Sequence, residues 1–172
     1  IYPAMAFQRG IVVSNGKQTA RLEYLMIHNF VSIKHTLTMG LSDWSYEPDS
    51  PNYTPRISGA VLDNIGGLSI IRKDDGRSLK FFEFPLKEKV DKLLATYTGE
   101  NINPLPSFKG EPFDFPLNWK DSEVAAMSVY DLLVPRNGRK DFRVGVMAAY
   151  QSPTNTAYSV TSVNRWDFEC KR

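Results

Sequence analysis

The sequence ISGAVLDNIGGLSIIRKDDGRSLKFFEF, residues 57–84, decides the fold. It contains three apolar segments of strand length, Ile57–Leu62, Leu68–Arg72 and Leu79–Phe84. Asp74-Asp75-Gly76 separates the last two, and such a turn sequence between strands is a strong hairpin signal. We therefore predict that residues 57–84 form three strands, the last two of which are joined as a hairpin.

One long amphipathic helix is predicted upstream of these strands. Ala6–Ser14 has strand character, and Asn15-Gly16 after it is a dipeptide typical of a turn. From Thr19 to Met39 apolar residues recur every three to four positions, which is the spacing of a helix with one buried face. Gly40 then ends the pattern, as a C-terminal cap in the left-handed conformation would.

Proline-rich stretches separate the next elements. Trp44–Pro55 has prolines at 48, 51 and 55, which exclude a regular helix and indicate an ordered loop. Leu86–Leu94 is predicted as a short helix. Gly99–Pro116 has four prolines and is predicted as a long loop, ordered by the burial of its phenylalanines.

A second helix and a strand pair are predicted near the C-terminus. Asp121 is a suitable N-cap for a helix that runs to Leu133. The inner face of this helix would carry Val124, Met127 and Leu132 or Leu133. Phe142–Tyr150 alternates apolar residues as a half-buried strand does, and Tyr158–Val163 is its expected partner.

The order of these elements predicts the fold class. Strands dominate, and two substantial helices lie between strand groups. This order favours an α+β protein with two stacked, mainly antiparallel sheets flanked by helices, an α/β/β/α sandwich. With 172 residues and 42% hydrophobic composition, we expect one compact domain over residues 1–172.

Composition and charge restrict the partners. The net charge is only +2, so no strong field is available for a polyanion; we expect no nucleic acid partner, whereas a small anion remains compatible. No apolar run approaches the roughly 20 residues that cross a bilayer, and we expect no membrane partner. Cys170 is the single cysteine and cannot form an internal disulfide, which fits a cytoplasmic protein.

Common cofactor and metal motifs are absent. His28 and His35 lie seven residues apart on the predicted helix, without neighbouring ligands at metal-binding spacing. The sequence contains no Gly-x-Gly-x-x-Gly stretch, no Walker loop and no Gly-x-Ser-x-Gly turn. We expect neither a metal nor a cofactor.

Two longer segments are more specific: YEPDSPNYTPRISG, residues 46–59, and NPLPSFKGEP, residues 103–112. Both resemble signature stretches of the bacterial branch of the archaeal-type inosine monophosphate (IMP) cyclohydrolases. Ile1-Tyr2 and SNGKQT, residues 14–19, are more weakly similar to the same family. The resemblance begins partway into the family pattern, and we expect that upstream strands, supplied by preceding residues or by another chain, complete the domain.

The resemblance implies an Ntn-hydrolase-like fold and a hydrolase of purine nucleotide biosynthesis. The family reaction is the reversible ring closure of formamido-imidazole-carboxamide ribotide to IMP. The expected partners are a purine nucleotide and further copies of the chain in a homo-oligomer. No metal takes part in this chemistry, which needs a base for the amide proton, donors for the oxyanion and anchors for the phosphate.

The resemblance also implies two catalytic residues. Glu47 matches an active-site carboxylate and would orient or deprotonate the carboxamide; otherwise it is a solvated loop residue. Tyr2 matches an active-site tyrosine that would donate to the oxyanion or to the leaving oxygen; otherwise it is an ordinary buried tyrosine. 

Five further residues are the main candidates for substrate binding, and Lys17, Ser107 and Lys109 are weaker ones. Arg56 would form two hydrogen bonds to a phosphate or fix Glu47, or belong to a structural salt bridge. Asn52 and Thr54 would bind the base or ribose, or satisfy loop backbone groups. Asn15 and Gly16 would present backbone amides beside a helix start, which suits an anion, or form a plain turn.

Two non-enzymatic hypotheses remain beside the cyclohydrolase. The chain departs from the family pattern at Pro3, Ala6 and Ala20, where polar family side chains are missing. This favours a non-catalytic protein that keeps the fold and binds a purine nucleotide. The missing upstream strands favour a structural subunit that completes a sheet with another polypeptide.

Overall fold

The computed structural model describes residues 3–7, 9–28, 32–87, 90–99, 102–135, 140–152 and 157–169. The chain forms two compact units, residues 1–117 and 118–172. The described part has mixed α and β content, and all its strand pairs are antiparallel, so the α+β prediction is confirmed. Among the described residues, no helix is long and apolar enough to span a bilayer.

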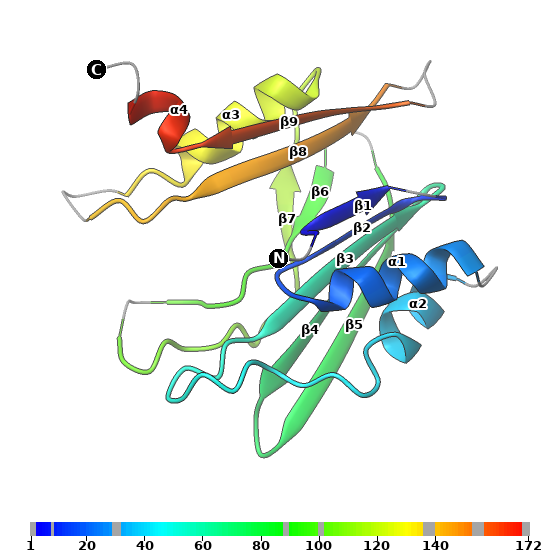
Figure 1. Cartoon of the computed structure of the whole chain (residues 1–172), viewed down its shortest axis with the longest axis vertical. Helices are drawn as coiled ribbons and strands as arrows, with labels where there is room; N and C mark the ends of the chain where they lie inside the picture. Colours follow the sequence, from blue (N-terminus) through cyan, green and yellow to red (C-terminus); the bar gives the residue numbers. More distant parts are fainter. Residues whose placement is uncertain are drawn as a thin grey trace. The chain divides into compact units, whose positions relative to one another are not determined.

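A five-stranded antiparallel sheet forms the centre of the first unit (Figure 1). Its strands follow one another in chain order: β1 (Met5–Phe7), β2 (Ile11–Ser14), β3 (Arg56–Leu62), β4 (Ile65–Lys73) and β5 (Arg77–Pro85). The strands predicted within residues 57–84 are confirmed. β4 pairs with β5, and the pair of residues next to the turn is Lys73 and Arg77. The predicted hairpin at Asp74-Asp75-Gly76 is therefore correct.

The predicted single helix over Thr19–Met39 is wrong, because two helices occupy this stretch. They are α1 (Gln18–His28) and α2 (Ile33–Met39). Ser32 caps α2: its backbone is extended, and its hydroxyl accepts a hydrogen bond from the His35 amide at 3.3 Å. Because Ser32 is an N-cap, a second helix starts there. The spacing of apolar residues continues across this break and does not reveal it.

The left-handed cap predicted at Gly40 is also wrong. Gly40 has a φ of −65°, in the right-handed region. Close packing explains the glycine, since a Cβ at this position would lie 2.8 Å from side-chain atoms of both Leu22 and Leu25.

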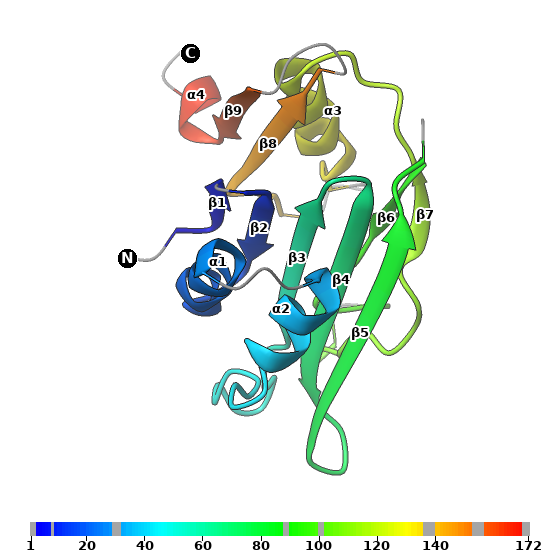
Figure 2. The ribbon, with the colours of Figure 1, turned by 90° about the vertical axis from the view of Figure 1, so that its right-hand side faces the viewer.

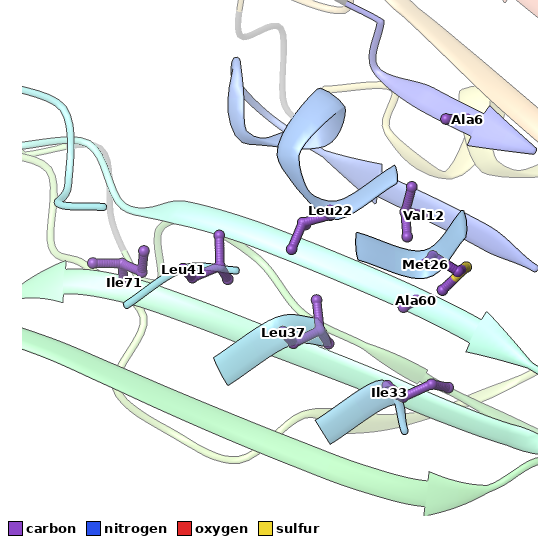
Figure 3. Packing of buried hydrophobic residues seen from close by; sticks show 9 residues of the cluster. All are labelled: Ala6, Val12, Leu22, Met26, Ile33, Leu37, Leu41, Ala60 and Ile71. Atoms are coloured by element: carbon purple, nitrogen blue, oxygen red, sulfur yellow. The ribbon is translucent and has the colours of Figure 1, made fainter. Parts of the chain in front are cut away.

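Both helices cover the same face of the five-stranded sheet (Figures 1 and 2). Figure 3 shows the buried cluster between these helices and the sheet, with side chains from the helices directed toward the strands. Leu22 and Leu37 are fully buried there, and each such side chain contributes about 1.5–3 kcal/mol by leaving water. The cluster comprises Ala6, Val12, Leu22, Met26, Ile33, Leu37, Leu41, Ala60 and Ile71.

The helix predicted over Leu86–Leu94 is wrong, because β6 (Val90–Leu93) lies there and pairs with β7 (Phe113–Pro116). A short apolar run does not distinguish the two structures, and the distant partner strand decides. The predicted loop Gly99–Pro116 accordingly ends in a strand. The Phe108 amide donates to the Thr96 carbonyl at 3.0 Å and its ring is buried, whereas Phe113 is half exposed.

The second unit pairs one helix with one hairpin. The helix is α3 (Ser122–Leu132), the hairpin strands are β8 (Gly145–Gln151) and β9 (Tyr158–Asn164), and a short α4 (Trp166–Glu169) follows. Asp121 caps α3 as predicted, accepting from the Val124 amide at 2.8 Å. The predicted strand that begins at Phe142 starts only at Gly145, and Phe142 is exposed.

The inner face of α3 agrees with the prediction at Met127, which packs against the buried cluster, and differs at Leu132 and Leu133. Ala126 and Tyr130 are its buried apolar residues, and they pack with Val163 of β9 and with Met127. Leu132 and Leu133 are exposed, because the helix ends there beyond the stripe that meets the hairpin.

Candidate functional site

Arg56, the first residue of β3, is the centre of the candidate site. Its Nη1 lies 2.7 Å from Oε1 of Glu47, and its Nε donates to the Ser45 carbonyl at 2.8 Å. The guanidinium also lies over the Trp44 ring, 5.2 Å from the centroid. The Arg56 side chain is 12% exposed and the Glu47 side chain 37%, so the carboxylate is the solvent-accessible member of the pair.

The turn before α1 reaches the same place. The Asn15 side chain bridges two backbone groups around Arg56: its Nδ2 donates to the Pro55 carbonyl at 2.9 Å, and its Oδ1 accepts from the Ile57 amide at 2.8 Å. The backbone amide of Asn15 donates to the Ile57 carbonyl at 3.2 Å. This amide is therefore engaged within the protein rather than directed to an anion.

Gly16 is required by a close approach. A Cβ there would lie 2.4 Å from Nη1 of Arg56 and 2.4 Å from Oε1 of Gln18. A side chain at residue 16 would displace the ends of Arg56 and Gln18 from their present contact.

Gln18 is a site residue that the sequence reasoning missed. It is fully buried in the first turn of α1, where its Oε1 accepts from Nη1 of Arg56 at 3.2 Å and its Nε2 approaches Oδ1 of Asn15 at 3.5 Å. The available signal was its place two residues after the Asn15-Gly16 turn, inside a stretch similar to the family. Nothing local indicated that a glutamine there faces an arginine 38 residues away.

Asn52 and Thr54 lie in the same loop but bond to other partners. Thr54 is tied to Asp49 through its amide at 2.6 Å and its hydroxyl at 2.5 Å, and the hydroxyl also bonds to Tyr97. Oδ1 of Asn52 accepts from the Leu105 amide at 3.0 Å. These contacts match the loop-stabilising alternative for both residues.

The electrostatics of this part of the loop follow from the same bonds. The Thr54 hydroxyl bond is the main reason that the pKa of Asp49 is lowered from its ordinary value, and it outweighs the opposing effect of burial. A hydrogen bond to the charged form of a carboxyl favours ionisation.

The predicted residues therefore separate into two groups. The first group surrounds the guanidinium of Arg56 and consists of Glu47, Asn15 and Gly16. The second group, Asn52 and Thr54, fastens the loop to Leu105 and Tyr97. Tyr2 lies outside the described residues. Within the described ranges, no group of three or more His, Cys, Asp or Glu side chains is arranged to hold a metal ion.

The fold and site define an α+β protein with an accessible loop carboxylate held by a less exposed arginine. Residues 1–155 match the model of the family described as IMP cyclohydrolase-like protein, and the chain belongs to this family. The family match supports an enzyme of the IMP cyclohydrolase-like class. Among curated proteins, a sequence search finds no match.

Proposed function

We propose that the chain catalyses the reversible closure of formamido-imidazole-carboxamide ribotide to IMP, with Glu47 as the base. The carboxamide nitrogen attacks the formyl carbon, a C–N bond forms, and the amide proton passes to Glu47. The formyl oxygen leaves as water with two protons, one from the carboxamide nitrogen and one that the formamido nitrogen gives up as its double bond to the former formyl carbon forms. Tyr2 is the proposed donor to this oxygen. The observation that carries this proposal is the Glu47–Arg56 pair, which presents an oriented carboxylate at the surface of the loop.

The ion pair supports one of the roles considered for Arg56. Because its guanidinium already contacts Glu47, Gln18 and the Ser45 carbonyl, we assign Arg56 to orienting the carboxylate rather than to gripping phosphate. Asn15 and Gly16 support the arginine from the adjacent turn. Asn52 and Thr54 remain proposed contacts to base or ribose through the edges of their side chains that the loop leaves free.

The remaining parts of the proposal concern the assembly. The five-stranded sheet β1–β5 and the hairpin β8–β9 each have helices on one face. Apolar side chains, such as Val61 of β3 and Met147 of β8, lie on the other face. This pattern supports a stacked, Ntn-hydrolase-like sandwich. The family match crosses both units, which supports a single domain. We further propose a cytoplasmic homo-oligomer that binds a purine nucleotide.

The direct test is to incubate the purified protein with the formamido ribotide and follow the ultraviolet change that accompanies closure of the purine ring. We expect product formation in proportion to protein concentration, abolished by heat denaturation. Tight ribotide binding without turnover by a folded protein would instead establish the non-catalytic alternative. That alternative is favoured by the missing polar side chains at Pro3, Ala6 and Ala20.

A further inference from the structure

A second polar site lies in the first unit, between three segments that are distant in sequence. It is a pocket of about 330 Å³ formed by the tip of the 46–59 loop, the β4–β5 turn and the 103–112 loop. We call it the two-lysine pocket. Its lining residues are Pro51, Asn52, Tyr53, Lys73, Asp74, Asp75, Pro104, Leu105, Ser107 and Lys109.

Buried polar contacts hold the walls of this pocket together. Arg72 is only 4% exposed; its Nη1 donates to the Phe108 carbonyl at 3.2 Å and its Nε to Oδ2 of Asp74 at 3.1 Å. The bond from the Leu105 amide to Asn52 fastens the third wall. A guanidinium is costly to bury unless it is paired, so these contacts fix the shape of the pocket.

The pocket lining carries two ammonium groups, Lys73 and Lys109, and two carboxylates, Asp74 and Asp75. Asp74 is already paired with Arg72, and Nζ of Lys109 approaches the same carboxylate at 3.4 Å. Lys73 brings a further ammonium group, whose Nζ lies 3.4 Å from the centroid of the Tyr53 ring. Because buried Arg72 already neutralises Asp74, the two lysines of the lining are balanced by Asp75.

Tyr53 is held in an unusual conformation at the wall of the pocket. Its φ is 45°, in the left-handed region that a bulky side chain rarely adopts. Such strain persists only where surrounding contacts impose it, and it is concentrated at ligand-binding sites. Hydrogen bonds with Ser50 and Lys73, together with the charge of Lys73, lower the pKa of the phenol.

We propose that the two-lysine pocket binds the phosphate group of a phosphate monoester through Lys73 and Lys109. The ammonium group of lysine is a compact charge with three donors and suits a phosphate dianion. Tyr53 and Ser107 line the pocket from two different loops, and their hydroxyls are the proposed neutral donors. Identifying the monoester as the ribotide rests on the proposed function, in which Arg56 orients Glu47 and does not bind the phosphate.

The test uses ribose 5-phosphate as the ligand and ribose as its uncharged match. Binding is measured by calorimetry on the whole chain and on the variants Lys73→Met, Lys109→Met and the double variant. Lys34→Met, which removes the same charge from the exposed face of α2, is the control. All these positions are exposed, and circular dichroism before and after thermal melting verifies folding.

We expect the wild type to bind ribose 5-phosphate and not ribose. Each pocket substitution should weaken binding about 10-fold or more, as expected for loss of a charged hydrogen bond, and Lys34→Met should leave it unchanged. Absence of binding by the wild type, equal binding by the double variant, or an equal loss in Lys34→Met would overturn the proposal. A protein that binds ribose 5-phosphate in this way but fails the ring-closure assay refutes the proposed function alone.

Discussion

Nη1 of Arg56 lies 2.7 Å from Oε1 of Glu47, and this contact joins the first residue of β3 to the loop that precedes it. The arginine side chain is 12% exposed and the glutamate side chain 37%. The protein thus fixes the cationic end of the pair within the fold and presents the anionic end. In the proposed reaction, the presented carboxylate receives the amide proton.

Glu47→Gln should keep the shape of the site while removing its charge and basicity. General-base catalysis typically contributes about 10²- to 10⁴-fold, so kcat should fall by this order with a modest change in KM. Glu83→Gln, an exposed glutamate of β5, is the matched control and should retain activity. Wild-type turnover by Glu47→Gln, in a variant with unchanged melting, would show that Glu47 is an ordinary loop residue.

Arg56→Ala separates the two roles considered for the arginine. If Arg56 orients Glu47, kcat should fall more than substrate affinity; if it grips phosphate, affinity should fall more, because uniform binding energy is lost. Removing the side chain also leaves the Ser45 carbonyl and Gln18 without their donor, which should cost about 1–3 kcal/mol of unfolding free energy. Steady-state kinetics and urea denaturation on the same preparations distinguish these effects.

Gln18→Leu tests whether the buried glutamine holds the arginine in place. The leucine fills a similar volume but cannot accept the hydrogen bond from Nη1 of Arg56. We expect a lower kcat with KM little changed, and faster exchange of the Arg56 side-chain NH signals in ¹⁵N NMR spectra. Unaltered Arg56 signals together with unaltered kcat would show that Gln18 serves only the packing of α1.

Gly16→Ala should disturb the site through size alone. The added Cβ would lie 2.4 Å from both Arg56 and Gln18, so these side chains must move, at a cost of about 1–3 kcal/mol typical of overpacking. Gly76→Ala is the comparison, because a Cβ at this hairpin position meets nothing within 4 Å. Its unfolding free energy should stay within about 0.5 kcal/mol of wild type. Equal stability of the two variants would contradict the geometry of the turn.

Thr54→Val should alter the pH dependence of stability. The Thr54 hydroxyl lowers the pKa of Asp49 in the folded protein, so this bond stabilises the fold above the unfolded pKa. The contribution is lost as the pH falls below about 4 and through the lower folded pKa. The difference in unfolding free energy between wild type and Thr54→Val should therefore be larger at neutral pH than in acid. A difference that does not change with pH would exclude the proposed linkage.

The sequence by itself determined the elements whose signals are local. The hairpin at Asp74-Asp75-Gly76, the turn at Asn15-Gly16 and the Asp121 cap of α3 depend on residues within a few positions of each other. These turn and capping preferences act between near neighbours in the chain, so a sequence pattern reveals them wherever tertiary packing does not override them. The long loop signatures likewise indicated the family that residues 1–155 match.

The tertiary structure alone decided the features that depend on distant partners. The pairing of β6 with β7, the contact of Gln18 with Arg56 and the bond from Leu105 to Asn52 each join residues separated by some 20 to 50 positions. The two-lysine pocket likewise combines three separate segments. Whether a polar side chain binds a ligand or a neighbouring loop depends on which groups the fold brings within about 3 Å of it, and no local pattern specifies those groups.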